Sequence, residues 1–152
     1  MLVRRALPAD IEAMSAVMTA SITELCAADH HDDLAEITHW TRNKSPDGVR
    51  AMLANPALSL FVAELDGAVV GVAGTEGDTV ALNYVAPEAR FAGVSKALMA
   101  RLEAELKASG HATGRLFSSA TARRFYQGIG WIDAGETGPD YDRSGRPMRK
   151  VL

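Results

Sequence analysis

Apolar side chains recur along the chain at two spacings, one of which is the helical spacing of three to four residues. Residues 10–27 carry it at Ile11, Met14, Val17, Met18, Ile22 and Leu25. The clearest helix is predicted over 93–109, where Gly110 follows at the position of a C-cap glycine. The apolar stripe of that helix consists of Val94, Leu98, Leu102 and Leu106. Shorter or weaker helical patterns occupy residues 34–40, 46–54 and 120–129.

Runs rich in β-branched residues predict strands in the rest of the chain. Asp66-Gly67 joins the two halves of residues 59–74, which is a strong signal for a hairpin. A second turn is predicted over 74–78 and a third strand over 79–86, so residues 60–85 indicate an antiparallel meander. The glycines between these strands (Gly71, Gly74 and Gly77) are interpreted as hairpin residues, because no helix follows them as a dinucleotide-binding loop requires. Further strands are predicted over 2–7, 114–119, 131–136 and 147–152, with a loop over 138–145.

The order of elements places one strand–helix–strand unit inside a mainly antiparallel chain. Such a crossover joins two parallel strands. We therefore predict an α/β fold (mixed α+β), with a largely antiparallel mixed sheet, a central parallel pair and helices on both faces. The length of 152 residues, without repeat or linker, indicates a single domain over 1–152.

Composition narrows the classes of partner. The net charge of −3 argues against a nucleic-acid partner, and small basic clusters such as Arg123-Arg124 are interpreted as solvated. No signal-peptide region and no run of about 18 apolar residues occurs, so no membrane partner is expected. The single cysteine, Cys26, excludes an intrachain disulfide and suits a reducing compartment. These features predict a soluble cytoplasmic protein.

Two groups of reactive side chains lie in the N-terminal part of the chain. Cys26 sits in an apolar helical pattern, which favours a small core residue over a nucleophile. The run "DHHDD" at 29–33 has metal-ligand types, but adjacent side chains on a helix diverge and no distant His or Cys set completes a site. No metal is therefore predicted. For His30 and His31, an acceptor-binding or base role stays open beside a solvated helix connection.

The stretch "YVAPEARFAGVSKAL" at 84–98 leads from a strand into the longest predicted helix. A helix N-terminus presents unpaired N–H groups and partial positive charge to an anion. Ala92, Gly93 and Ser95 leave room for a phosphate, while Arg90 and Lys96 add charge. The alternative is that Gly93 only permits the turn and the cations are solvated.

This stretch resembles motif A of the GCN5-related N-acetyltransferases, the GNAT family. The motif is written Arg/Gln-x-x-Gly-x-Gly/Ala, and Arg90-x-x-Gly93-x-Ser95 follows it with two departures. Ser95 replaces the last small residue, and Phe91 replaces a frequent glycine. Further along, "SSATARRFYQGIGW" resembles motif B, Ala-x-x-Phe-Tyr-x-x-x-Gly-Phe. Its positions are taken by Ala122, Phe125, Tyr126 and Gly130, with Trp131 at the last aromatic.

The resemblance implies acetyl-CoA as co-substrate, with no metal. The backbone amides of residues 91–95 would hold the pyrophosphate, with Arg90 and Lys96 near it; these five residues are Phe91, Ala92, Gly93, Val94 and Ser95. The strand of Tyr84 and Val85 would splay from its parallel neighbour, and its backbone would pair with pantetheine and polarise the acetyl carbonyl. Ser119, where many members carry Asn, would touch the pantetheine arm, and Phe125 would pack against the cofactor.

Acyl transfer from a thioester to an amine needs a proton for the departing thiolate, and Tyr126 is the candidate acid. The alternative is that Tyr126 only packs beside Phe125. Many members of the family use a Glu on the central strand as base, but residues 79–85 contain no carboxylate. The general base is therefore not identified, and an amine that arrives deprotonated needs none.

Two functions follow from the resemblance. The first is an acetyl-CoA-dependent N-acetyltransferase that acts by direct attack of a primary amine of a small molecule or a protein or peptide. The second is a non-catalytic acyl-CoA-binding or regulatory module of the same fold. Tyr126 favours the enzyme, and the missing strand carboxylate favours the module. The acceptor is not indicated, and a homodimer is compatible with the resemblance because dimers are common in the family.

Overall fold

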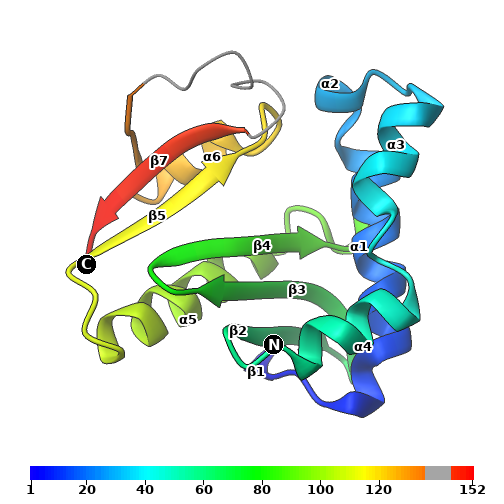
Figure 1. The fold of residues 1–152 in the computed structure, drawn as a ribbon, viewed down its shortest axis with the longest axis horizontal. Helices are drawn as coiled ribbons and strands as arrows, with labels where there is room; N and C mark the ends of the chain where they lie inside the picture. The colour runs from blue at the N-terminus through cyan, green and yellow to red at the C-terminus, as the bar shows by residue number, and fades with distance from the viewer. Residues whose placement is uncertain (136–144) are drawn as a thin grey trace.

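The computed structural model of the chain describes residues 1–135 and 145–152. The strands of this part form a seven-stranded sheet in the order β1-β2-β3-β4-β5-β7-β6 (Figure 1). They are β1 (Leu2–Arg5), β2 (Leu58–Leu65), β3 (Ala68–Glu76), β4 (Thr79–Val85), β5 (Thr113–Ser118), β6 (Ile132–Asp133) and β7 (Arg146–Val151). Neighbours run antiparallel, except that β4 and β5 are parallel. The predicted mixed sheet with a central parallel pair is therefore confirmed.

Helices cover both faces of this sheet. They are α1 (Ile11–Leu25), α2 (Ala27–His30), α3 (Leu34–Thr41), α4 (Pro46–Ala54), α5 (Val94–Ala108) and α6 (Arg123–Gly128), with 3-10 turns η1 (Pro8–Asp10) and η2 (Pro87–Ala89). Local chemistry starts two of them: Asp33 accepts the N–H groups of Ala35 and Glu36, and Ser45 accepts that of Gly48. Within the described residues, no helix is long and apolar enough to span a membrane.

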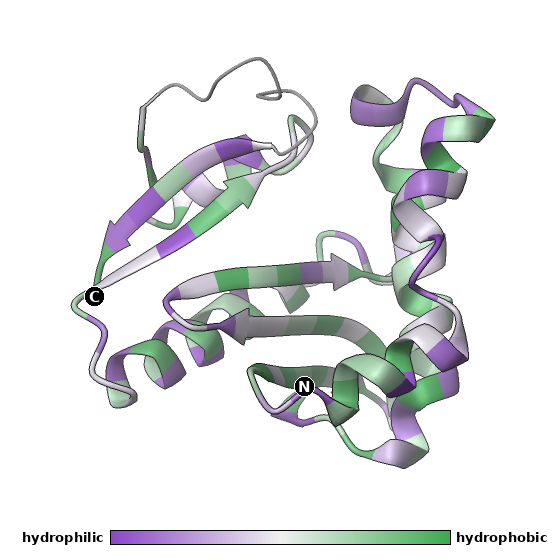
Figure 2. Ribbon diagram, in the orientation of Figure 1, coloured by the Kyte–Doolittle hydropathy of each residue, from purple (hydrophilic) through white to green (hydrophobic). Residues whose placement is uncertain are grey.

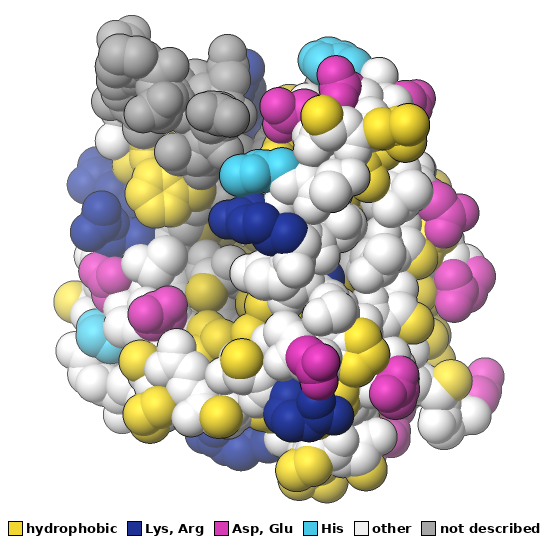
Figure 3. Space-filling model, turned by 45° about the vertical axis from the view of Figure 1, so that its right-hand side comes forward, with side chains coloured by type: hydrophobic (Ala, Val, Ile, Leu, Met, Phe, Trp, Pro, Cys, Tyr) yellow, Lys and Arg dark blue, Asp and Glu magenta, His cyan; other side chains and the backbone are white. Residues whose placement is uncertain are grey.

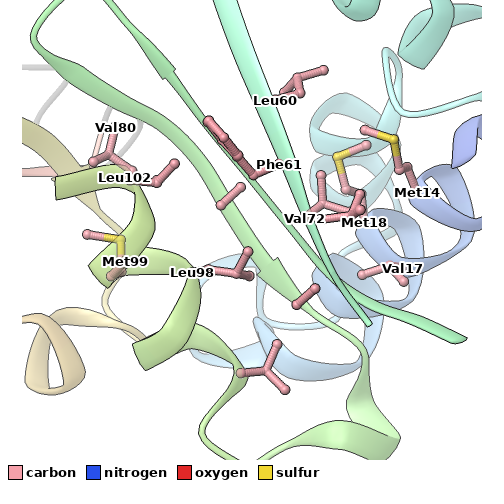
Figure 4. Close-up of a cluster of buried hydrophobic side chains, with 14 of the residues drawn as sticks. Met14, Val17, Met18, Leu60, Phe61, Val72, Val80, Leu98, Met99 and Leu102 are labelled. Atoms are coloured by element: carbon pink, nitrogen blue, oxygen red, sulfur yellow. The ribbon is translucent and has the colours of Figure 1, made fainter. Parts of the chain in front are cut away.

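The core lies between the helices and the central strands. Figure 4 shows Met14, Val17 and Met18 of α1 on one side of the strands, and Leu98, Met99 and Leu102 of α5 on the other. All six are at most 6% exposed. In Figure 2, hydrophobic residues predominate along β2, β3 and β4, whereas β7 carries several hydrophilic ones. The helical spacing of the apolar residues thus predicted the faces that are buried.

The parallel pair is joined over only a short length. Thr79 pairs with Arg115 and Val80 with Leu116, although β4 continues to Val85 and β5 to Ser118. A bulge in the pairing of β3 with β4 lies just after Val80, because Val80 is opposite Thr75 while Leu82 is opposite Gly74. Bulges bend a strand and increase its twist. The two strands therefore diverge beyond Val80 and leave an open edge on β4 (Figure 1).

Glycines on β3 differ from their predicted role. The turn between β3 and β4 consists of Gly77 and Asp78 alone, since β3 continues to Glu76. A Cβ at Gly71 would lie 2.7 Å from Val94 Cγ1, and one at Gly74 would lie 2.8 Å from Leu60 Cδ2. The interpretation of these two glycines as hairpin residues was wrong. They let neighbouring side chains approach the strand, and Gly71 in particular allows α5 to pack closely.

Several predicted boundaries also shift. The helix predicted over 10–27 ends at Leu25, and Cys26 separates it from the short α2. The strand predicted over 2–7 ends at Arg5. The strand predicted over 131–136 is limited to Ile132–Asp133 in the described part of the chain, and the loop predicted over 138–145 lies outside the described residues except for Gly145.

Candidate active site

A cavity of about 590 Å³ opens where β4 and β5 diverge. Its lining comes from β4, the junction into α5, the end of β5, α6 and the C-terminal half of α1. The predicted site residues that line it are Tyr84, Val85, Arg90, Phe91, Gly93, Val94, Ser95, Lys96, Ser119, Phe125 and Tyr126. Ala92 is exposed and does not line it. The fold therefore gathers around one cavity two motifs that are separate in the sequence.

The junction before α5 leaves backbone N–H groups outside the hydrogen-bond ladder of the helix. Ala97 N–H donates to Gly93 O at 3.1 Å, so the N–H groups of residues 93–96 precede the ladder of helical hydrogen bonds. Gly93 is the N-cap with φ +80°, and a Cβ added to it would meet nothing within 4 Å. The N–H of Ala92 is already engaged by Ala89 O at 3.3 Å. The amides that start α5 are thus the ones available to a ligand.

Phe91 takes a conformation that favours glycine. Its φ is +65°, in the left-handed region, and its side chain is 91% exposed. The guanidinium carbon of Arg90 lies 4.7 Å from the centre of its ring. The ring therefore contributes little to the core.

Backbone groups of β4 alternate between β3 and the open edge. Ala86 N–H donates to Val70 O of β3 at 2.8 Å. Alternate residues of a strand turn their N–H and C=O groups to opposite edges. Tyr84, two residues earlier, therefore faces β3 with its backbone, whereas Val85 and Asn83 present theirs at the open edge toward the cavity. Of the two residues predicted to pair with pantetheine, only Val85 has its backbone in that position.

Tyr84 lines the cavity, and its hydroxyl is buried. Burial raises the pKa of its hydroxyl to about 12, with smaller contributions from Cys26 and Tyr126. The ammonium of Lys44, which is 8% exposed, lies 6.0 Å from the centre of the Tyr84 ring. Burial, and to a lesser extent Arg42, lowers the pKa of this lysine.

Tyr126 lines the cavity and is 7% exposed. Its ring meets Phe125 and Trp131 edge-on, with centroids 5.3 Å and 6.4 Å away. Its oxygen accepts a hydrogen bond of 3.2 Å from Asn83 Nδ2, and Asn83 Oδ1 accepts one of 3.4 Å from Ser95 Oγ. Burial raises the pKa of Tyr126, and the bond from Asn83 acts in the opposite direction. Tyr126 is therefore protonated at neutral pH.

Ser119 has a structural task in addition to lining the cavity. Its Oγ accepts the N–H of Ala122 at 3.2 Å, which holds the loop that leads into α6. Asp29 supports the same loop from α2 by accepting the Thr121 hydroxyl and the Ala120 N–H, each at 2.6 Å. This link between α2 and the loop before α6 was not visible in the sequence.

The far side of the cavity is apolar and aromatic, and sequence reasoning missed it. Its lining there includes Ile22, Leu25, Cys26 and Trp40. Burial, with a smaller effect of Asp29, raises the pKa of the Cys26 thiol to about 11. The thiol is therefore not the reactive thiolate of a nucleophile.

His30 contacts two residues of this wall, Ile22 and Trp40. Its Nε2 lies 2.7 Å from Ile22 O, and its Nδ1 accepts the Asp32 N–H at 3.0 Å. The ring is 1% exposed and meets Trp40 edge-on at 6.1 Å. Both nitrogens are satisfied by one neutral tautomer. The prediction of a solvated connection was thus wrong for His30, although His31 beside it is exposed.

The run at 29–33 does not form a metal centre in the part of the chain that the structure describes. No three His, Cys, Asp or Glu side chains among these residues are grouped closely enough to hold an ion. Figure 3 shows acidic and histidine side chains at the top of the molecule, over α2 and α3, where His31, Asp32 and Asp33 are exposed.

Comparison with known proteins agrees with this geometry. A family model described as acetyltransferase (GNAT) domain matches residues 11–152. A GCN5-related N-acetyltransferase from Rhodopseudomonas palustris is 24% identical, with a TM-score of 0.86 over 99% of this chain and 95% of that one. The PaiA N-acetyltransferase from Thermoplasma acidophilum, solved with coenzyme A, is 19% identical, with a TM-score of 0.82 over 99% and 98%. An aminoglycoside 6'-N-acetyltransferase complexed with coenzyme A is 16% identical, with a TM-score of 0.71 over 99% and 97%. At these identities the similarity shows the fold alone, and no curated protein matches the sequence.

Proposed function

The chain belongs to the GNAT acetyltransferase family, since the family model covers residues 11–152, and from that membership we propose that it transfers the acetyl group of acetyl-CoA to a primary amine of a small molecule, a protein or a peptide. The observation that carries the proposal is the position of Tyr126. Its hydroxyl lies in the same cavity as the open edge of β4 and the N-terminus of α5. An acid, a backbone edge and an anion site are what direct acyl transfer from a coenzyme A thioester requires.

The residues present fit coenzyme A. The N–H groups of residues 93–96 and the exposed Arg90 and Lys96 would hold the pyrophosphate, and the space beside Gly93 leaves room for its oxygens. The free backbone groups of Val85 and Asn83 would bind the pantetheine arm as a neighbouring strand binds. Bound there, acetyl-CoA supplies the acetyl group as a thioester.

The chemistry proposed for this chain is a single displacement. The amine nitrogen forms a C–N bond to the acetyl carbonyl, and the C–S bond breaks. The backbone N–H at the open edge of β4 stabilises negative charge on the carbonyl oxygen as it develops. Tyr126 gives its hydroxyl proton to the sulfur, which leaves as a thiol. The proton that the amine loses passes to water, and water reprotonates the phenolate.

Amine-dependent release of free thiol tests the proposal. Purified protein is mixed with acetyl-CoA and a panel of primary amines, and thiol is followed with a colorimetric reagent. At least one amine should accelerate thiol release, and Tyr126→Phe should lower kcat by about 10²-fold, as is common for the loss of a general acid. Its affinity for acetyl-CoA should stay near that of the wild type. Binding of acetyl-CoA without thiol release for any amine would favour a non-catalytic acyl-CoA-binding module.

A further inference from the structure

Two polar side chains beside Tyr126 form a connected chain. Ser95 Oγ donates to Asn83 Oδ1 at 3.4 Å, and Asn83 Nδ2 donates to the Tyr126 oxygen at 3.2 Å. All three side chains line the cavity. They come from three separate elements, namely β4, the first turn of α5, and α6.

Ser95 contacts the oxygen end of the Asn83 amide. The hydroxyl donates to the amide oxygen, so the NH₂ group is the end that faces the tyrosine. Ser95 stands where the family motif has Gly or Ala, neither of which has a side chain that can donate. The departure from the motif thus places beside the asparagine a hydroxyl that Gly or Ala could not supply.

Asn83 in turn determines what the Tyr126 hydroxyl can do. Because the tyrosine oxygen accepts from Asn83, its own proton is not used in that bond and is available to another acceptor in the cavity. If an acceptor replaced the NH₂ group, the tyrosine hydroxyl would instead donate its hydrogen bond to that acceptor. The amide orientation therefore decides whether Tyr126 is presented as a proton donor.

We propose that Asn83 and Ser95 are positioning residues for acetyl transfer: Ser95 fixes the Asn83 amide, and Asn83 orients the Tyr126 hydroxyl and stabilises the phenolate that forms when the proton leaves. This inference rests on the proposed function, because it assumes that Tyr126 protonates the coenzyme A sulfur. It assigns a task to Ser95 beyond a place in the phosphate cradle.

The electrostatic surroundings of Tyr126 support this assignment. Burial opposes formation of a phenolate, and the hydrogen bond from Asn83 favours it. Among the described residues that line the cavity, Tyr84 on β4 and Cys26 after α1 are also titratable, and burial keeps both protonated at neutral pH. Two cations also line the cavity: Arg90 at the junction before α5, and Lys96 in the first turn of α5. On α6, Arg123 pairs with Asp133, and Arg124 is exposed. Asn83 is therefore the neighbour placed to stabilise a charged Tyr126.

A double-mutant cycle tests the chain. Asn83→Ala should lower kcat by about 10-fold or more, the effect of a hydrogen bond to a developing charge, and leave KM for acetyl-CoA within about twofold. Ser95→Ala should lower kcat by about threefold, but it should have no further effect on kcat in the Asn83→Ala background. Ser95→Thr, which keeps the hydroxyl, should restore kcat. Additive effects of the two alanine substitutions would refute the coupling.

Asn83→Asp is the matched control for shape. A carboxylate only accepts hydrogen bonds, so it should engage the Tyr126 O–H as a donor and lower kcat at least as far as Asn83→Ala does. Thermal melts of each variant show whether it is folded. Wild-type kcat in Asn83→Asp would overturn the proposal.

A titration without substrate separates this inference from the proposed function. In protein labelled with ¹³Cζ-tyrosine, the Tyr126 signal is assigned by its loss in Tyr126→Phe. Asn83→Ala and Asn83→Asp should both move the ionisation of Tyr126 to higher pH, because each removes the donor to the phenolate. No shift in either variant would refute the role of Asn83 even if the enzyme is active. A shift in a protein that releases no thiol with any amine would retain the hydrogen-bond chain and refute the proposed function.

Discussion

Gly93→Ala tests the phosphate cradle with the smallest possible perturbation. Gly93 is the N-cap of α5 at φ +80°, and a Cβ there would meet no atom within 4 Å. The added methyl group therefore creates no clash inside the folded chain. It projects into the space that a bound phosphate would take if the amides of α5 hold one.

The same helix offers a matched control. Gly110 follows α5 at its other end with φ +90°, and a Cβ there would also meet nothing within 4 Å. Since α5 has 15 residues, the two ends are separated by about 22 Å along the helix axis. Gly110 does not line the cavity. Gly110→Ala therefore imposes the same backbone strain at a distance from the proposed ligand.

The two substitutions should lower the stability of the protein equally but differ in their effect on coenzyme A affinity. A left-handed conformation of a residue other than glycine costs about 1–2 kcal/mol. For a chain of this size that lowers Tm by roughly 2–8 °C in either variant. Gly93→Ala should in addition weaken coenzyme A binding by about 10-fold or more, equivalent to about 1.4 kcal/mol, through loss of close phosphate approach.

Thermal melting and isothermal titration with coenzyme A measure both quantities on the same samples. Wild-type affinity in Gly93→Ala would refute the cradle. An equal loss of affinity in Gly110→Ala would show that the effect arises from helix stability and not from contact with phosphate.

Three further predictions follow from single contacts. Phe91→Gly should leave Tm nearly unchanged, because relief of about 1 kcal/mol of left-handed strain is offset by the chain entropy of glycine. If Phe91 acts through its backbone, the affinity of this variant for coenzyme A should stay within about threefold of the wild type. A loss of affinity beyond about 10-fold would contradict that role. Asp10 accepts hydrogen bonds of 2.8 Å and 2.9 Å from Arg4, and these hold the pKa of its carboxyl below the usual 3.8. The stability that this ion pair contributes is therefore present above pH 3.8 and is lost as the pH falls through the lower pKa of the folded state. In denaturant titrations, Asp10→Asn should be less stable than the wild type at pH 7 and lose less stability on acidification, and parallel curves of stability against pH would exclude the contribution of the ion pair. His30→Leu should lower the unfolding free energy by about 1–3 kcal/mol, because two buried hydrogen bonds are lost. The pH dependence of kcat should not change. Loss of one limb of the curve of kcat against pH would instead identify His30 as a base.

Local chemistry in the sequence predicted much of the fold. Asp66 and Gly67 adopt positive φ angles of 51° and 82°, as the two-residue hairpin signal requires. Gly93 and Gly110 bound α5 close to where the apolar stripe begins and ends. These predictions succeed because caps and turns depend on the conformational preferences of one or two residues, which no distant contact needs to supply.

Other assignments failed because distant contacts decide them. Gly71 and Gly74 look like turn residues in the sequence, but each is required by a side chain that approaches from another element. His30 looks solvated in a run of charged residues, yet Ile22 O and the ring of Trp40 enclose it. In each case the partner lies far enough along the chain that local pattern contains no trace of it.

The candidate site shows the same division. By itself the sequence determined the order of elements, the small and basic start of α5, and the motif that contains Tyr126, because these depend on residue type and short-range spacing. Only the tertiary structure decided that β4 and β5 part after Val80, that Val85 and not Tyr84 turns its backbone to the opening, and that Asn83 joins Ser95 to Tyr126. Strand register and the meeting of three separate elements are set by how the whole core packs, and that packing cannot be deduced from any one segment.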